Sequence, residues 1–97
     1  MRYDIILAPE AIEDLARLKA PHRAAVKAAL EVHLRHEPSK TSRSRIKRLR
    51  GLSRPQYRLR VGDFRVFYDV ADGAVDILAI VLKAEASAWL NQFGKPQ

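Results

Sequence analysis

The spacing of apolar residues predicts a helical N-terminal half that follows one short strand. Residues 3–7 (YDIIL) combine β-branched and large apolar side chains, which favours a strand. Pro9 suits the first turn of a helix, and Pro21 ends that helix and begins a second one that runs to about residue 36. The predicted apolar stripes are Ile12, Leu15, Ala16 and Leu18 in the first helix and Val26, Ala29, Leu30 and Leu34 in the second. We therefore expect an antiparallel helical hairpin after the first strand.

The period of the pattern changes from helical to strand-like at about residue 44. Residues 45–50 predict a ragged strand, because the apolar Ile46 and Leu49 lie three positions apart and indicate a bulge or a shorter strand. Clearer strands cover residues 56–61, 64–70 and 75–82. The last of them is apolar on both faces, as expected for the interior of a sheet. Residues 86–93 then predict a short helix that Gly94 ends.

These elements predict one α+β domain across residues 1–97. An N-terminal strand and a helical hairpin pack on a mainly antiparallel sheet, and a short C-terminal helix follows. The chain has no Cys, which excludes a disulfide scaffold, a thiolate zinc site and a cysteine nucleophile. Its longest apolar run has six residues, whereas roughly 20 are needed to span a bilayer. With no signal peptide visible, we expect a soluble, cytoplasmic protein without a membrane partner.

The Gly62-Asp63 pair predicts a two-residue hairpin turn between alternating strands. The expected register pairs Val61 with Phe64, Arg60 with Arg65, Leu59 with Val66, Arg58 with Phe67, and Tyr57 with Tyr68. The apolar partners then share the core face of the sheet. The opposite face carries Arg58, Arg60, Arg65, Phe67 and Asp69. Three arginines therefore converge on one side of the hairpin.

The positive charge is concentrated around this hairpin. The formal net charge is +7, and residues 40–65 hold ten basic side chains against one acidic one. Such a segment is typical of proteins that bind polyanions, because Lys and Arg release condensed counterions from phosphates. A solvated face that keeps the protein soluble is the alternative. Outside the three converging arginines, we expect general docking by Lys47, Arg48, Arg50 and Arg54.

The converging arginines predict a site for a phosphate. Arg60 lies opposite Arg65, and like charges in such a pair repel each other. An anion that bridges both guanidinium groups turns this repulsion into binding, and phosphate suits bidentate arginine contacts. Alternatively, Asp69 and solvent neutralise the patch. Phe67 either stacks an unpaired base or packs along the stem of Arg58.

The chain resembles the RelE/ParE superfamily of type II toxin–antitoxin toxins. The likeness rests on residues 49–52 (LRGL), residues 57–68 (YRLRVGDFRVFY) and residues 75–82, and it spans nearly the whole chain. RelE-like members cut messenger RNA in the ribosomal A site, whereas ParE-like members inhibit DNA gyrase without being nucleases. Both kinds are held inactive by a cognate antitoxin in a hetero-oligomer, so the resemblance implies an antitoxin partner.

The resemblance to RelE-like members implies that Arg58, Arg60 and Arg65 bind and polarise the scissile phosphate. A ribose 2′-OH then attacks that phosphate without a metal or another cofactor. This favours a ribosome-dependent mRNA endonuclease (an mRNA interferase) that inhibits translation, and a gyrase inhibitor is the alternative. RelE-like members usually carry an Arg or His after the last strand, where this chain has Lys83 and Glu85. We expect Lys83 to supply the cation, and Glu85 to be either a base or a helix N-terminal acid.

Two further groups of residues are less informative. His33 and His36 stand three apart next to Glu37, but neighbouring imidazoles on an exposed helix are usually surface residues, so we expect no metal site. Trp89 lies on the apolar stripe of the last helix, and we expect it to anchor the core rather than to stack a base.

Overall fold

The computed structural model describes residues 1–97 and has the expected α+β architecture. Its helices are α1 (Pro9–Arg17), α2 (Ala20–Leu34) and α3 (Ala86–Phe93), and a 3₁₀ turn η1 (Lys83–Glu85) precedes α3. Its strands are β1 (Asp4–Leu7), β2 (Ile46–Arg48), β3 (Leu52–Arg54), β4 (Tyr57–Val61), β5 (Phe64–Ala71), β6 (Ala74–Leu82) and β7 (Lys95–Pro96). No helix is long and apolar enough to cross a bilayer.

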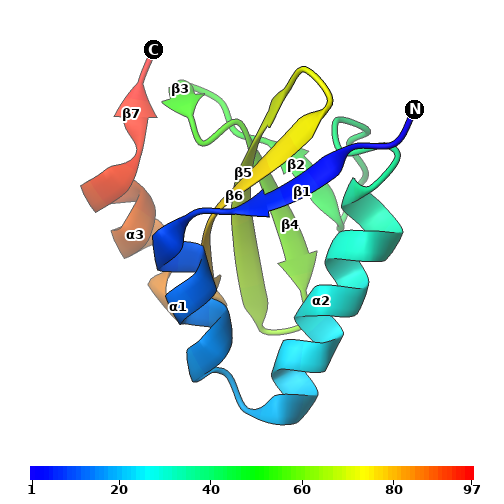
Figure 1. Ribbon diagram of the computed structural model, residues 1–97. Helices are drawn as coiled ribbons and strands as arrows, with labels where there is room; N and C mark the ends of the chain where they lie inside the picture. Colours follow the sequence, from blue (N-terminus) through cyan, green and yellow to red (C-terminus); the bar gives the residue numbers. More distant parts are fainter.

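One mixed, mainly antiparallel sheet organises the molecule. Its strand order is β1-β6-β5-β4-β2, with β1 parallel to β6 and every other pair antiparallel. The strand at residues 75–82 is therefore interior, as its two apolar faces predict. Helices α1 and α2 diverge from their connecting turn and lie on one side of the sheet (Figure 1). Helix α3 lies to the left of the sheet in this view, partly behind α1.

The core lies between the sheet and the two N-terminal helices. Thirteen buried residues form it, among them Val26, Leu30 and Leu34 of α2 and Leu59, Val66 and Tyr68 of the hairpin strands. The predicted stripe of α2 is thus confirmed. The hydroxyl of Tyr68 donates a hydrogen bond of 2.7 Å to the carbonyl of Pro38, which ties the connection after α2 to the core. Burial raises the pKa of this phenol.

The predicted apolar stripe of α1 is wrong in part. Ala11 and Leu15 are the buried residues of this helix, whereas Ile12 is 56% exposed and Ala16 is also exposed. Residues four apart share a helix face, so the Ala11–Leu15 pair fixes which side meets the sheet. Ile12 is therefore rotated away from the core despite its apolar side chain.

Strands β3 and β7 form a second, two-stranded sheet that the sequence pattern does not predict. Leu52 pairs with Pro96 and Arg54 pairs with Lys95, which brings the C-terminal end back beside the middle of the chain. Figure 1 shows β7 following α3 and lying next to β3. Strands of two and three residues are too short to show a period of two, so alternation gives no signal for them.

Candidate phosphate-binding site

The β4–β5 hairpin has the register that the sequence predicts. All five expected pairs occur, from Val61 with Phe64 to Tyr57 with Tyr68. Gly62 has a φ of +55°, and no non-glycine residue has a positive φ, which matches a type II′ turn with glycine in its first position. Because paired residues share a face, Arg58, Arg60 and Arg65 stand together on the side of the sheet opposite α1 and α2.

Arg58 has a partly buried guanidinium group with an unpaired hydrogen-bond donor. Its side chain is half-buried, and its Nε is buried without a hydrogen-bond partner. The one contact of its guanidinium is a long one, 3.5 Å from Nη2 to the carbonyl of Ser44. Burial lowers the pKa of Arg58, and the positive charges of Arg65 and Arg60 lower it further. A buried donor in this state favours an anion beside it.

Arg65 has a different environment, because its side chain is only 7% exposed. Its Nη1 donates hydrogen bonds of 2.9 Å to the carbonyls of Gly62 and Phe64. The side chain therefore braces the hairpin turn. Its charge has no carboxylate within ion-pair distance and adds to the positive potential around Arg58.

Arg60 is exposed and extends the cluster towards the edge of the sheet. Its backbone N–H donates to the carbonyl of Arg45 at 2.8 Å, and Nη1 of Arg45 donates to the carbonyl of Arg60 at 3.3 Å. Arg45 is thus held beside the main chain of Arg60, a contact that sequence reasoning did not predict, and its side chain also lines a groove with Val32 and His33 of α2. The antiparallel pairing of β2 with β4 is the signal that places Arg45 there.

No acidic side chain neutralises the cluster. The four ion pairs of the chain are Arg17–Asp14, Arg35–Glu31, Lys40–Glu37 and Arg54–Asp69. Asp69, the expected neutralising group, is engaged elsewhere: it accepts 2.7 Å from the backbone N–H of Gln56 and lies 3.3 Å from Arg54. The alternative in which Asp69 compensates Arg58 is therefore wrong.

Two lysines border the arginines. Lys47 on β2 lies directly opposite Arg58 on β4, so the two share the same face of the sheet. Lys83 follows β6, and its backbone N–H donates 2.8 Å to the carbonyl of Asp63 in the hairpin turn. Its exposed side chain is therefore attached at the end of the sheet where the hairpin turns.

Three other basic residues of the predicted docking strip lie apart from the arginines. Arg48 is opposite Tyr57 on the other face, with its guanidinium 5.2 Å from the centre of that ring. Arg50 is exposed in the turn before β3. Arg54 pairs with Asp69. The basic segment of residues 40–65 therefore does not form one continuous surface strip.

Phe67 is not available to stack a base, because it is only 1% exposed. The indole of Trp89 covers it, with ring centres 4.9 Å apart and planes 5° from parallel. Trp89 thus anchors α3 on the sheet, but outside the main core in which it was expected. It also shields Phe67, for which contact with a base was one of the two expected roles. The alternation of β5 placed Phe67 on this face correctly, but the contact comes from a helix 22 positions later in the chain.

The remaining titratable candidates do not join the arginines. Glu85 is the N-cap residue of α3 and lines a shallow groove with Asp14 and Arg17 of α1. The ring of His22 packs 5.2 Å from that of Phe64 beside the hairpin, a contact between distant segments that the sequence does not signal. The structure contains no group of three or more His, Cys, Asp or Glu side chains that could hold a metal.

Comparison with known proteins places this geometry in a family. The model of the ParE toxin of type II toxin–antitoxin systems matches residues 5–86. No curated protein matches the chain in sequence. The family match covers most of the chain, including the β4–β5 hairpin that carries the arginine cluster. The chain belongs to the ParE toxin family, within the RelE/ParE superfamily, and is a toxin of a type II toxin–antitoxin system.

Solved structures support the same fold. The RelE–RelB complex from Pyrococcus horikoshii is similar, with a TM-score of 0.70, 26% identity, and coverage of 86% of this chain and 97% of that one. A free double arginine-to-alanine mutant of E. coli RelE has a TM-score of 0.68, 26% identity, and coverage of 94% and 93%. The toxin–antitoxin complex RelBE2 from Mycobacterium tuberculosis has a TM-score of 0.62, 26% identity, and coverage of 84% and 99%.

Proposed function

We propose that this toxin is an endonuclease that cleaves messenger RNA on the ribosome and thereby inhibits translation. One observation carries the proposal: Arg58 holds a buried Nε without a partner, next to Arg60 and Arg65, on a face where no carboxylate compensates the charge. A guanidinium in this state favours an oxyanion with two acceptor oxygens, and the phosphodiester of RNA has two such non-bridging oxygens.

The proposed chemistry uses the 2′-OH of the substrate as the nucleophile. The 2′-oxygen loses its proton and forms a bond to phosphorus, the bond from phosphorus to the 5′-oxygen breaks, and the 5′-oxygen takes up a proton. The products are a 2′,3′-cyclic phosphate and a 5′-hydroxyl. Negative charge builds on the phosphoryl oxygens during this step, so fixed cations at that position stabilise the transition state.

The residues take different roles in this scheme. Arg58 and Arg60 contact the phosphoryl oxygens, because one is half-buried with a free donor and the other is exposed. Arg65 is hydrogen-bonded to the hairpin turn, and its positive charge adds to the potential at the phosphate without direct contact. Lys83, attached at the turn end of the sheet, is a cation and proton donor for the leaving oxygen.

A cognate antitoxin is the proposed protein partner. The similar structure from Mycobacterium tuberculosis is a toxin–antitoxin complex, and the one from Pyrococcus horikoshii is a complex of RelE with RelB. An acidic segment of such a partner would neutralise the arginine cluster of this chain, which has no acid of its own there.

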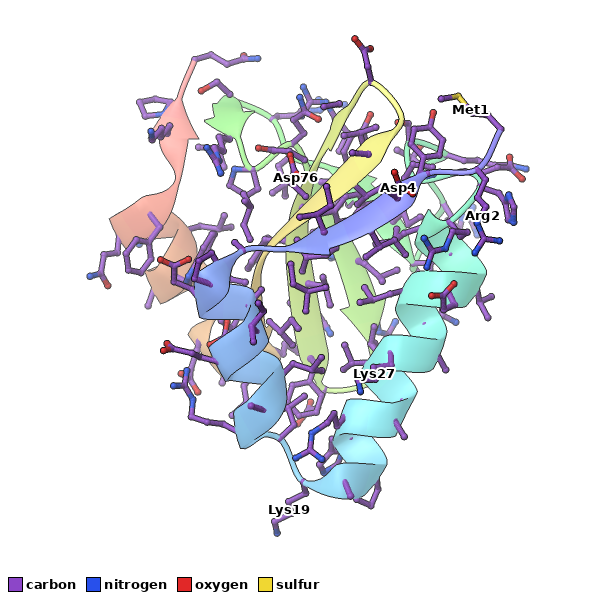
Figure 2. All side chains as sticks on the ribbon, in the orientation of Figure 1. Met1, Arg2, Asp4, Lys19, Lys27 and Asp76 are labelled. Carbon is purple, nitrogen blue, oxygen red and sulfur yellow. The ribbon has the colours of Figure 1, made fainter.

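The test is to induce the chain in cells without its antitoxin and to map new 5′ ends on cellular RNA. We expect cuts within translated codons that carry 5′-hydroxyl ends, and we expect Arg58→Gln to abolish them. Arg2→Gln is the matched control, because Arg2 is exposed and lies near the N-terminus, away from the hairpin turn (Figure 2). Intact messages together with growth arrest would overturn the proposal.

Inhibition of DNA gyrase is the second candidate, and one observation favours it. None of the hydrogen bonds or ion pairs of the arginine cluster involves a Glu, His or Tyr side chain, so no protein group is seen in place to act as a general base. A DNA-damage response with intact messages, unchanged by Arg58→Gln, would assign the toxin to this class.

A further inference from the structure

A cavity of about 240 Å³ lies between the first turn of α1, the β3–β7 ribbon and α3, beside Trp89. Its floor includes Leu78, which is the extra residue of a bulge in β6 opposite Phe67, and Phe67 is paired with Arg58. The cavity therefore adjoins the Phe67–Trp89 stack of the arginine face on one side and the first turn of α1 on the other. Its volume falls just below the roughly 300 Å³ at which pockets for drug-sized ligands begin, so it suits a group as small as one nucleobase.

The apolar wall of the cavity is aromatic. Phe67 stacks on the Trp89 indole, and Trp89 also lines the cavity. Phe93 lines it as well, with its ring tilted by 40° at 5.4 Å from Trp89 and 54% exposed. A flat ring fixed from behind is a platform on which another flat ring can stack.

The polar rim has opposite charges on its two sides. Arg54 and Lys95 are paired residues of the β3–β7 ribbon and form the cationic side. Glu10, in the first turn of α1, forms the acidic side. Arg54 is held by Asp69, whereas Lys95 and Glu10 have no ion-pair partner. The site therefore fits a ligand with an anionic group at one end and N–H donors at the other.

We propose that this cavity binds one nucleotide, whose base stacks on Trp89, whose phosphate contacts Lys95 and Arg54, and whose exocyclic amino group donates to Glu10. A carboxylate accepts from the amino group of cytosine, so cytosine fits this site better than uracil, which has no such group. The proposal rests on the proposed function in one respect: the nucleotide belongs to the RNA strand whose phosphate is held at Arg58. Phe67 is paired with Arg58 in the sheet. Asp69, which positions Arg54 at the rim of the cavity, lies two residues further along β5, about 7 Å from Phe67.

Glu10 also distinguishes this ligand from a protein side chain. An apolar side chain from an antitoxin would fill the aromatic wall but would leave Glu10 and Lys95 without partners. An acidic partner segment would be repelled by Glu10. Neither of these occupants pairs with both Lys95 and Glu10, whereas a nucleotide does so through its phosphate and its amino group.

Trp89 is the single Trp of the chain, so its indole N–H gives one NMR signal that reports on the cavity. The experiment titrates the full, antitoxin-free chain with 5′-CMP, 5′-UMP and N-acetyl-phenylalaninamide in parallel. We expect 5′-CMP to shift the signal saturably, with an affinity at least about fivefold above that of 5′-UMP, and we expect no shift with the phenylalanine derivative. A shift with that derivative alone would reassign the cavity to a protein side chain and overturn the proposal, as would no shift with any ligand.

Two surface variants test the assigned contacts without touching the aromatic platform. Glu10→Gln should remove the preference for 5′-CMP over 5′-UMP, because an amide both donates and accepts. Lys95→Ala should weaken both nucleotides by a similar factor of at least about threefold, as loss of a phosphate contact does. Lys27→Ala on the other side of the sheet is the control and should change neither. Affinities that stay at the wild-type values in both test variants would contradict the assignment.

The outcome is separable from the fate of the proposed function. If RNA is cut in cells but the indole signal ignores nucleotides, the cavity assignment fails and the nuclease assignment stands. If nucleotides bind as described but no RNA is cut, the nuclease assignment fails, and the cavity remains a nucleotide site on a toxin with another target.

Discussion

Arg58 and Arg65 lie on the same sheet face, yet their guanidinium groups have different surroundings. Arg65 is enclosed and donates twice to carbonyls of its own turn, whereas Arg58 has a buried Nε with nothing to bond. At the residue scale this separates two roles. Arg65 stabilises the hairpin, and Arg58 is held in a state that an anion would relieve.

Arg58→Gln should leave the fold intact and the free energy of unfolding unchanged, or raise it by up to about 1 kcal/mol. The reason is that the substitution removes a partly desolvated charge that lacks a partner and stands near two like charges. Urea unfolding of the antitoxin-free chain measures this. A loss of more than about 1 kcal/mol would show that Arg58 is a structural residue.

Arg65→Ala should behave in the opposite way and lower the free energy of unfolding by about 1–3 kcal/mol, because two charge-assisted hydrogen bonds to the turn are lost. The same urea measurement applies, and loss of toxicity in this variant is then attributed to the fold rather than to substrate contact. Unfolding at the wild-type urea midpoint would refute the bracing role.

At the scale of elements, α3 has two structural roles that its short sequence does not predict. Its Trp89 covers Phe67, and its end directs the chain into β7, which pairs with β3 beside the proposed nucleotide cavity. Alternation and the Gly62 turn sufficed to predict the β4–β5 register and the face of each arginine. The β3–β7 pair and the Trp89–Phe67 contact depend on packing between segments far apart in the chain, and no local period encodes them.

Gly94→Ala should disturb this junction. A Cβ at residue 94 would lie 2.5 Å from the backbone carbonyl oxygen of Leu90, so the turn from α3 into β7 must shift. We expect a lower melting temperature and loss of the amide protection that β7 gains from β3. Thermal unfolding of the full chain measures the melting temperature, and hydrogen exchange measures the amide protection of the β3–β7 pair. Unchanged protection at this pair would contradict the expectation.

At the scale of the whole molecule, the charge is distributed by face. The formal net charge is +7, and none of the four ion pairs of the chain involves Arg58, Arg60 or Arg65. The α1–α2 side of the sheet holds ion pairs, including Arg17–Asp14 and the Arg35–Glu31 pair. The sequence predicted the excess of charge, but not that Arg48 and Arg54 of the expected docking strip contact Tyr57 and Asp69, since these contacts depend on neighbours in three dimensions.

This asymmetry predicts how binding to a short single-stranded RNA depends on salt. Contacts to about three to five phosphates give a slope of roughly −2 to −3.5 in a plot of log affinity against log salt concentration. Arg60→Ala should make the slope less steep by about 0.7. Lys27→Ala should not, because Lys27 lies between α1 and α2 on the other side of the sheet (Figure 2). Equal slopes for both variants would mean that the arginine face does not bind the RNA strand.

The central claim is that Arg58 holds the scissile phosphate, and a reconstituted cleavage reaction tests it most directly. Purified ribosomes carrying a defined message are mixed with the wild-type chain, with Arg58→Gln, with Arg58→Lys or with the Arg2→Gln control, and the rate at which 2′,3′-cyclic phosphate ends form is measured in a single turnover. We predict that Arg58→Gln is slower by about 100-fold or more, that Arg58→Lys recovers only part of the rate, and that the control matches the wild type. Cleavage by Arg58→Gln at the wild-type rate would contradict the claim.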